Sequence, residues 1–214
     1  MTMSTMPIST RGRARGSYKK SEVSRRQVLD AAVQALSQRG YAKTSVSDIA
    51  QAAGMSKGAV HYHFDSKDDL IAKVLEHCVT VTRDQVRAVW NRPAPPIEKI
   101  RNAIHEMRQI RRAGTAELRV IADLAAQALH EPRLRALLAD MHEANRKDFV
   151  DFLTKGIETL GIKPKVPIHI VPRLLLGTVD GLAMHDYFDP PGPGDDELIE
   201  HVLQMIGVSL FEIS

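Results

Sequence analysis

The chain has 214 residues, of which 43% are hydrophobic, with one cysteine and a net charge of +3. This length suffices for one medium domain or two small ones with a buried core. The single cysteine excludes an intrachain disulfide, and no apolar run approaches the roughly 20 residues of a membrane-spanning helix. Because the N-terminus lacks the apolar segment of a signal peptide, we expect a cytoplasmic protein.

Charge is distributed unevenly along the chain. Residues 1–67 contain 11 Lys and Arg against 4 Asp and Glu, a net charge of +7, whereas residues 68–214 contain 18 against 22, a net charge of −4. A basic N-terminal third followed by an acidic remainder favours attraction to phosphates at one end of the protein.

Residues 1–20 are rich in Ser, Thr, Gly and Arg and show no hydrophobic period, which predicts a disordered basic tail. Its basic side chains, Arg11, Arg13 and Arg15 among them, suit either an arm that follows DNA phosphates or a solvated tail. The sequence leaves both interpretations open.

Residues 21–39 predict the first helix. An apolar stripe runs along it at helical spacing, and Gly40 ends it. Ser24 and Gln27 have the spacing of a capping box, in which two side chains satisfy the free backbone N–H groups at the start of a helix.

Two short helical patterns follow, at about 46–53 and 56–63. Ser45 and Asp48 form a capping box for the first, and Gly54 suits the left-handed turn after it. The apolar residues that should hold the two helices together are Ile49, Ala53, Val60 and Phe64. Helix, glycine-containing turn and helix form a helix-turn-helix, whose second helix enters the major groove of DNA.

Between Gly40 and Leu70 the chain has the sequence G-Y-x-x-T-S-V-x-D-I-A-x-A-A-G-M-S-K-G-A-V-x-Y-H-F-x-S-K-x-x-L. This segment, with the helix before it, resembles the N-terminal domain of the TetR family of bacterial transcriptional regulators. The resemblance implies a three-helix DNA-binding domain followed by a helical domain that binds a small molecule and dimerises. The rest of the chain resembles the family only in length and helical character.

The resemblance also assigns DNA contacts. Base-facing positions of the family correspond to Lys57, Gly58, Ala59 and Tyr62, and phosphate-facing positions to Thr44, Ser45, His63 and Lys67. Small residues let the helix backbone approach the groove, while Lys and Tyr side chains reach base edges. The N-terminus of the helix at 46–53 adds oriented N–H groups for a phosphate. His61 stands where the family often has tyrosine, so a phosphate contact there would use an imidazole N–H and vary with pH.

The remainder predicts further helices and no strand. A fourth helix, capped by Ser66 with Asp69, runs to Trp90. A fifth begins at Ile97 and ends before Gly114, a sixth covers 115–130, a seventh ends at Gly161, an eighth covers about 168–187, and a ninth contains 198–210. The predicted fold class is all-α with about nine helices. Its parts are a tail at 1–20, a helix-turn-helix domain at 21–67 and a ligand-binding and dimerisation domain at 68–214.

The family resemblance implies a ligand cavity among the middle helices and a homodimer through the last two. Residues that could line the cavity are Met107, Leu118, Met141, Phe149, Phe152 and Met184, although for any single one plain core packing is the better explanation. Polar anchors inside it would be Arg119, Asp123 or Asp180. Gly177 and Gly181 lie four apart in the eighth helix, a spacing that fits a dimer interface and an intrachain core equally.

Other kinds of site find no support in the pattern. His61 and His63 point about 200° apart on a helix, and the remaining histidines lack the H-x-x-x-H spacing of a metal site. Asp180, His185 and Asp186 are better explained as exposed or paired helical side chains than as acid–base groups. No glycine-rich phosphate loop or nucleophile elbow occurs. We expect no cofactor, no metal and no enzymatic activity.

We therefore predict a ligand-responsive, sequence-specific DNA-binding regulator that acts as a homodimer. It is expected to be a repressor that a small molecule of unknown identity releases from a near-palindromic operator. One alternative is an architectural DNA binder, which would bind all sequences alike. The other is an all-α enzyme with an accessory DNA-binding domain, which would need a convergent polar cluster in its C-terminal part.

Overall fold

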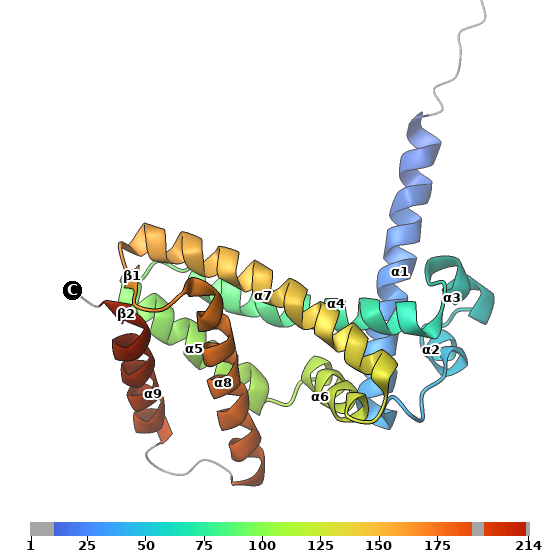
Figure 1. Ribbon diagram of the computed structural model, residues 1–214. Helices are drawn as coiled ribbons and strands as arrows, with labels where there is room; N and C mark the ends of the chain where they lie inside the picture. The colour runs from blue at the N-terminus through green and yellow to red at the C-terminus, as the bar shows by residue number, and fades with distance from the viewer. Residues whose placement is uncertain (1–10, 190–194, 213–214) are drawn as a thin grey trace, which may run out of the picture. The chain divides into compact units, whose positions relative to one another are not determined.

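The computed structural model describes residues 11–189 and 195–212. The bounds of the elements are α1 (Arg11–Arg39), α2 (Val46–Ala52), α3 (Lys57–His63), α4 (Lys67–Trp90), α5 (Pro96–Arg112), α6 (Ala116–Ala128), α7 (Pro132–Leu160), β1 (Lys163–Pro164), the 3-10 turn η1 (Ile168–Ile170), α8 (Val171–Phe188), α9 (Asp195–Leu210) and β2 (Phe211–Glu212) (Figure 1). The nine α-helices of this part of the chain confirm the predicted all-α class. In the same residues no helix has the length and apolar character needed to cross a membrane.

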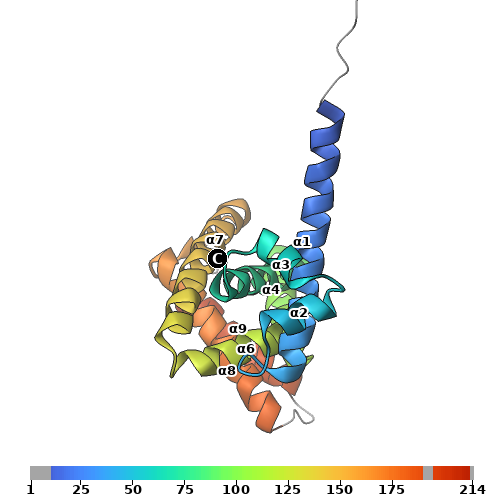
Figure 2. The ribbon, with the colours of Figure 1, turned by 90° about the vertical axis from the view of Figure 1, so that its right-hand side faces the viewer.

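The chain divides into two compact units, Met1–Val74 and Leu75–Ser214, here called the N-terminal and C-terminal units. In the N-terminal unit, α2 and α3 lie beside the C-terminal half of α1, as both views show (Figures 1 and 2). The predicted small core is confirmed by the low exposed fractions of Ile49 (0%), Ala53 (4%), Val60 (1%) and Phe64 (2%). Burial of each large apolar side chain stabilises the fold by about 1.5–3 kcal/mol.

Helix α1 begins at Arg11, so residues 11–20, expected to be a disordered tail, are helical. Residues 1–10 of the predicted tail lie outside the described part of the chain. Ser24 lies inside the helix, where no free N–H group needs a cap, and the predicted cap with Gln27 does not form. A hydrogen bond of 2.5 Å links Ser24 Oγ to His63 Nε2, and Gln27 Nε2 donates to the Ala53 carbonyl at 2.9 Å. Both polar side chains therefore attach α1 to the helix-turn-helix.

The turn between α2 and α3 has the hydrogen bonds of a glycine-terminated helix end. Gly54 has φ 66°, its N–H donates to the Gln51 carbonyl at 3.0 Å, and the Met55 N–H donates to the Ala50 carbonyl at 2.9 Å. This pair of bonds is the Schellman motif, which favours glycine at the left-handed position. The predicted turn at Gly54 is confirmed.

The C-terminal unit is built around α5, α8 and α9. Its core contains Ile104 and Met107 of α5, Val171, Leu175 and Val179 of α8, and Val202, Ile206 and Leu210 of α9. Helix α6 packs on α7, and α7 also contacts α8. This unit therefore buries one apolar side of each of α5, α8 and α9.

Two features of this unit were not predicted. Strands β1 and β2 form an antiparallel ribbon in which Lys163 pairs with Glu212. Arginines of α5 form ion pairs with α8: Arg108, only 1% exposed, lies 3.2 Å from Asp186, and Arg111 pairs with Asp180. Both aspartates on α8 are thus paired, in agreement with the preferred interpretation that they are exposed or paired helical side chains and not acid–base groups.

Candidate nucleic-acid interface and ligand groove

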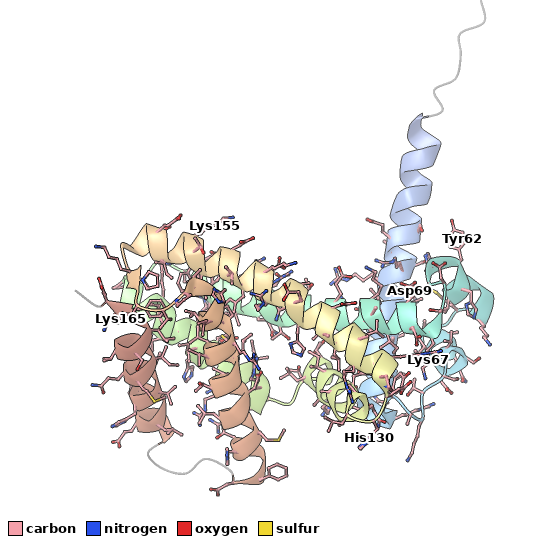
Figure 3. All side chains as sticks on the ribbon, in the orientation of Figure 1. Tyr62, Lys67, Asp69, His130, Lys155 and Lys165 are labelled. Carbon is pink, nitrogen blue, oxygen red and sulfur yellow. The ribbon has the colours of Figure 1, made fainter. Side chains whose placement is uncertain are left out.

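The outward face of α3 is formed by the predicted base-contacting residues. Val60 points inward and is buried, whereas Gly58 and Tyr62, four residues apart, lie on the opposite side of this helix. Tyr62 is 79% exposed and projects from the helix (Figure 3). Lys57 is exposed at the N-terminal end, and Ala59 is half-buried. One face of α3 therefore combines Gly58, where the helix backbone can approach another molecule closely, with the phenol of Tyr62 and the ammonium of Lys57.

Contacts on the other side of α3 fix the orientation of this face. Ser56 is the N-cap, and its hydroxyl accepts from the Ala59 N–H at 3.1 Å. Beyond the C-terminal end, the guanidinium of Arg25 lies 5.4 Å from the ring centroid of Phe64. With the Ser24–His63 hydrogen bond, these contacts hold both ends of the short helix. Ser24, Arg25 and Gln27 were missed as bracing residues because their partners are remote in sequence.

The predicted phosphate-contacting residues at the start of α2 also have structural roles. Thr44 is 2% exposed, and its hydroxyl donates to the Gly40 carbonyl at 2.7 Å. Ser45 forms the predicted capping box, in which its N–H donates to Asp48 Oδ2 at 2.8 Å and its hydroxyl accepts from the Asp48 N–H at 3.2 Å. The phosphate contacts of both residues stay predictions.

The carboxylate of Asp48 modifies the electrostatics of this helix start. The hydroxyl of Ser45, then its backbone N–H and the guanidinium of Arg39, hold the pKa of Asp48 below its usual 3.8. Asp48 is therefore ionised at neutral pH, and a phosphate approaching this end of α2 would also meet a negative charge.

The remaining predicted contacts differ in exposure. His61 is exposed on α3, while His63 is half-buried and bonded to Ser24. Lys67, at the start of α4 (Figure 3), places its ammonium 4.1 Å from the ring centroid of Tyr41. This cation–π contact holds the side chain in one orientation while leaving it half-exposed.

A groove of about 470 Å³ lies between α4 and α7 in the C-terminal unit. Residues lining it are Arg83, Arg87 and Asn91 from the α4 side and Asp148, Asp151, Phe152 and Lys155 from α7. Its volume falls within the range of small-molecule sites. The sequence contained a signal for it, because these residues recur at spacings of three and four on their helices, but the two stripes lie far apart in the chain.

The predicted cavity residues do not come together around this groove. Only Phe152 lines it; Met107 belongs to the core, Phe149 packs against that core, Leu118 and Met141 are half-buried, and Met184 is 60% exposed. Of the suggested polar anchors, Arg119 is exposed and Asp180 pairs with Arg111. Ligand contacts by the predicted set stay a prediction.

Helices α8 and α9 each carry an exposed stripe. On α8 and the residue before it, the stripe consists of Ile170, Leu174, Gly177, Gly181, Met184 and Phe188, with alternating spacings of four and three. On α9 it consists of Leu198, His201, Met205 and Val208, with the same kind of spacing. These ten residues are called the seam below. Alternating spacings of three and four are typical of helices that pack along a partner helix.

In the described residues no group of three or more His, Cys, Asp or Glu side chains is arranged to hold a metal ion.

Known protein families match most of the chain. Residues 28–74 match the family described as "Bacterial regulatory proteins, tetR family", and residues 96–208, more than half of the chain, match "BetI-type transcriptional repressor, C-terminal". The first match contains the helix-turn-helix, and the second contains the core of α5, α8 and α9 except Leu210.

Relatives of similar length share this assignment. The HTH-type transcriptional repressor KstR2 of Mycobacterium tuberculosis is 26% identical over 79% of this chain and 83% of its own length. A transcriptional regulator from Rhodococcus sp. Rha1 is 27% identical, with a TM-score of 0.64 over 86% of this chain and 94% of that one. The fold is also similar to a regulator FadR from Bacillus subtilis, solved with stearoyl-CoA, which is 20% identical with a TM-score of 0.64 over 86% of this chain and 97% of that one. This chain belongs to the TetR family of bacterial transcriptional regulators and is a ligand-responsive, DNA-binding transcriptional repressor.

Proposed function

We propose that this repressor recognises its operator through the outward face of α3, with Lys57, Gly58 and Tyr62 toward the bases. The observation that carries this proposal is the division of α3 into a buried side around Val60 and an exposed side opposite it. Lys67 and His61, at its edges, supply charge or N–H groups for phosphates. Sequence preference is expected, because Lys and Tyr side chains contact base edges.

The protein acts in this proposal as a homodimer through the seam on α8 and α9. Leu174, Met184 and Met205 are 45%, 60% and 58% exposed in the single chain. Exposure of these apolar side chains to water is unfavourable, and contact with a second copy would bury them. Gly177 and Gly181 would allow close approach of the two α8 helices. Two helix-turn-helix motifs would then enter successive major grooves of a near-palindromic site, about 34–36 Å apart.

A small molecule bound in the C-terminal unit would release the DNA. Helix α4 is shared by the two units, since it starts at Lys67 and ends at Trp90 beside the α4–α7 groove. A ligand that favours one orientation of α4 would change the separation of the two DNA-binding motifs. The stearoyl-CoA in a structure of the same fold supports a small organic effector. The protein would carry out this role in the cytoplasm, without enzymatic activity.

The test is selection of DNA from a random library by the purified protein, followed by competition with random DNA at two salt concentrations. A near-palindromic sequence, bound by two subunits and resistant to competitor, is the expected result. Equal affinity for all sequences, lost at higher salt, would instead indicate an architectural binder.

A further inference from the structure

The α4–α7 groove has a cationic lining. Arg83, Arg87 and Lys155 stand against Asp148 and Asp151, so the ionisable groups sum to one positive charge. Arg83 pairs with Asp148, and this ion pair removes one charge of each sign from the balance. The Nε of Arg83 is buried and has no hydrogen-bond partner among the described residues.

Two cations of the groove have no carboxylate partner within the described part of the chain. Arg87 lies with its guanidinium 5.9 Å from the ring centroid of Phe152, and Lys155 projects from α7 (Figure 3). Arg87 lies in the last turn of α4 and Lys155 in the C-terminal half of α7, and both side chains line the same groove. A guanidinium and an ammonium placed in this way suit a carboxylate or phosphate between them.

The groove also offers an aromatic wall. The rings of Phe152 and Trp90 meet edge to face, with their centroids 5.0 Å apart. Gly156 makes room for the indole, because a Cβ at this position would lie 3.0 Å from Trp90 Cζ2. An apolar part of a ligand can therefore pack against Phe152 while its charged end meets Arg87 and Lys155.

We propose that this groove is the effector site and that it takes an organic anion, with an apolar or aromatic body and a carboxylate or phosphate group. The proposal deepens the function proposed above and rests on it. Arg87 and Lys155 hold the anionic group, Arg83 and Asn91 line the groove beside it, and Phe152 contacts the body.

The experiment uses the full-length protein and four probes that share one biphenyl body. They are 4-biphenylacetate, 4-biphenylyl phosphate, the neutral 4-biphenylacetamide and the cationic 4-biphenylmethylamine. Binding is measured by titration calorimetry and by the emission of Trp90, the only tryptophan of the chain, which contacts the Phe152 wall. The carboxylate and phosphate probes distinguish the two kinds of anionic group.

The variants are Arg87→Gln and Lys155→Gln, with Lys147→Gln as a control at an exposed position of α7 outside the groove. We expect at least one anion to bind and to change Trp90 emission, the amide and amine to bind more weakly, and each groove variant to lose about tenfold in affinity for the anion. Lys147→Gln should bind like the unaltered protein. The proposal is overturned if the amide or amine binds as tightly as the anions, if no anion binds, or if all three variants behave alike.

A DNA measurement separates this proposal from the proposed function. The anion that binds should release the selected operator DNA from the unaltered protein, and this release should require a higher anion concentration with Arg87→Gln. Anion binding without any effect on DNA would overturn the assignment of the groove as effector site. Absence of any preferred DNA sequence would instead refute the proposed function, since the calorimetry needs no DNA.

Discussion

Lys57 and Lys67 are both cations near α3, but their surroundings differ. Lys57 is exposed at the start of the outward face, whereas Lys67 lies over the Tyr41 ring at the edge. We predict that Lys57→Ala lowers the preference for operator over random DNA by about tenfold, since a base contact is lost. Lys67→Ala should weaken binding to both DNAs equally and flatten the salt dependence by up to about one unit of slope.

Filter binding at several salt concentrations measures both effects, with Lys147→Ala as a control on the C-terminal unit. Thermal unfolding of each variant shows whether loss of the contact with Tyr41 also lowers stability. Equal losses on operator and random DNA for both variants would refute the division into base and phosphate contacts.

Cys78 is fully buried in α4, and this burial determines how readily its thiol ionises and reacts. Burial, with a smaller contribution from the negative charge of Glu117, raises the pKa of its thiol from 9.0 to about 12. The thiolate is the reactive form, so we predict that a thiol reagent leaves the folded protein unmodified at pH 8 but labels it in denaturant. Rapid labelling of the folded protein would show that the thiol is accessible.

The same shift affects stability at high pH. In the unfolded chain the Cys78 thiol ionises near pH 9, whereas in the folded protein it stays protonated until about pH 12. The contribution of this group is therefore fully present below pH 9 and is lost as the pH rises toward 12. Cys78→Ala should show a smaller loss of stability across this interval in chemical denaturation.

Local sequence was a good guide where a residue and its partner lie within one turn. The capping box of Ser45 with Asp48 and the cap from Ser66 to the Asp69 N–H both form as predicted. Ser24 has the same local spacing with Gln27, yet its partner is His63, 39 residues away. Spacing cannot distinguish these cases, because it does not show whether a helix continues upstream of the candidate cap.

At the scale of elements, two glycines provide a matched test of helix endings. Gly54 and Gly161 end α2 and α7 with φ 66° and 65°, and a Cβ at either would meet no described atom within 4 Å. Substitution by alanine therefore adds only the strain of a left-handed backbone, about 1 kcal/mol in each case. We predict similar losses of unfolding free energy for Gly54→Ala and Gly161→Ala in urea denaturation.

Only Gly54 lies in the turn that places α3 beside α2. Gly54→Ala should also weaken operator binding, whereas Gly161→Ala should leave it unchanged at temperatures where both variants are folded. A loss of DNA affinity common to both variants would mean that general destabilisation, and not the geometry of this turn, is responsible.

Helix number and most helix ends followed from apolar periodicity, glycine and proline. The β1–β2 ribbon could not be predicted in this way. Each strand has only two residues, and Pro164 is one of the two in β1, so no alternating strand pattern can be recognised. For the groove between α4 and α7, periodicity places the residues on one side of each helix but does not show that these two sides form one groove. Its residues had to be recognised as facing each other across two helices, and the predicted cavity instead followed hydrophobicity, which selects core residues such as Met107.

At the scale of the whole molecule, a substitution in the seam on α8 and α9 should affect the stability of the monomer and of the proposed dimer in opposite directions. Gly177 lies inside α8, and a Cβ there would meet no described atom of the same chain within 4 Å. Alanine is favoured over glycine in a helix by about 1 kcal/mol. We predict that Gly177→Ala stabilises the isolated chain but weakens the dimer, because two α8 helices would no longer approach closely. Unfolding measured at low and high protein concentration should show opposite changes.

The seam also predicts a loss of operator binding without any change in the DNA-binding motif. Met184, 60% exposed toward the C-terminal end of the stripe on α8, would lie between two copies, so Met184→Glu should place two unpaired carboxylates in an apolar contact and produce monomers. Lys147→Glu reverses a charge at an exposed position of α7, away from the seam, and should remain dimeric. Sedimentation velocity measures whether each variant is a monomer or a dimer.

The monomeric variant should bind the whole operator no more tightly than it binds a single half-site, since the two DNA-binding motifs are no longer tethered to each other. If Met184→Glu stays dimeric and keeps its operator affinity, the dimer uses another surface.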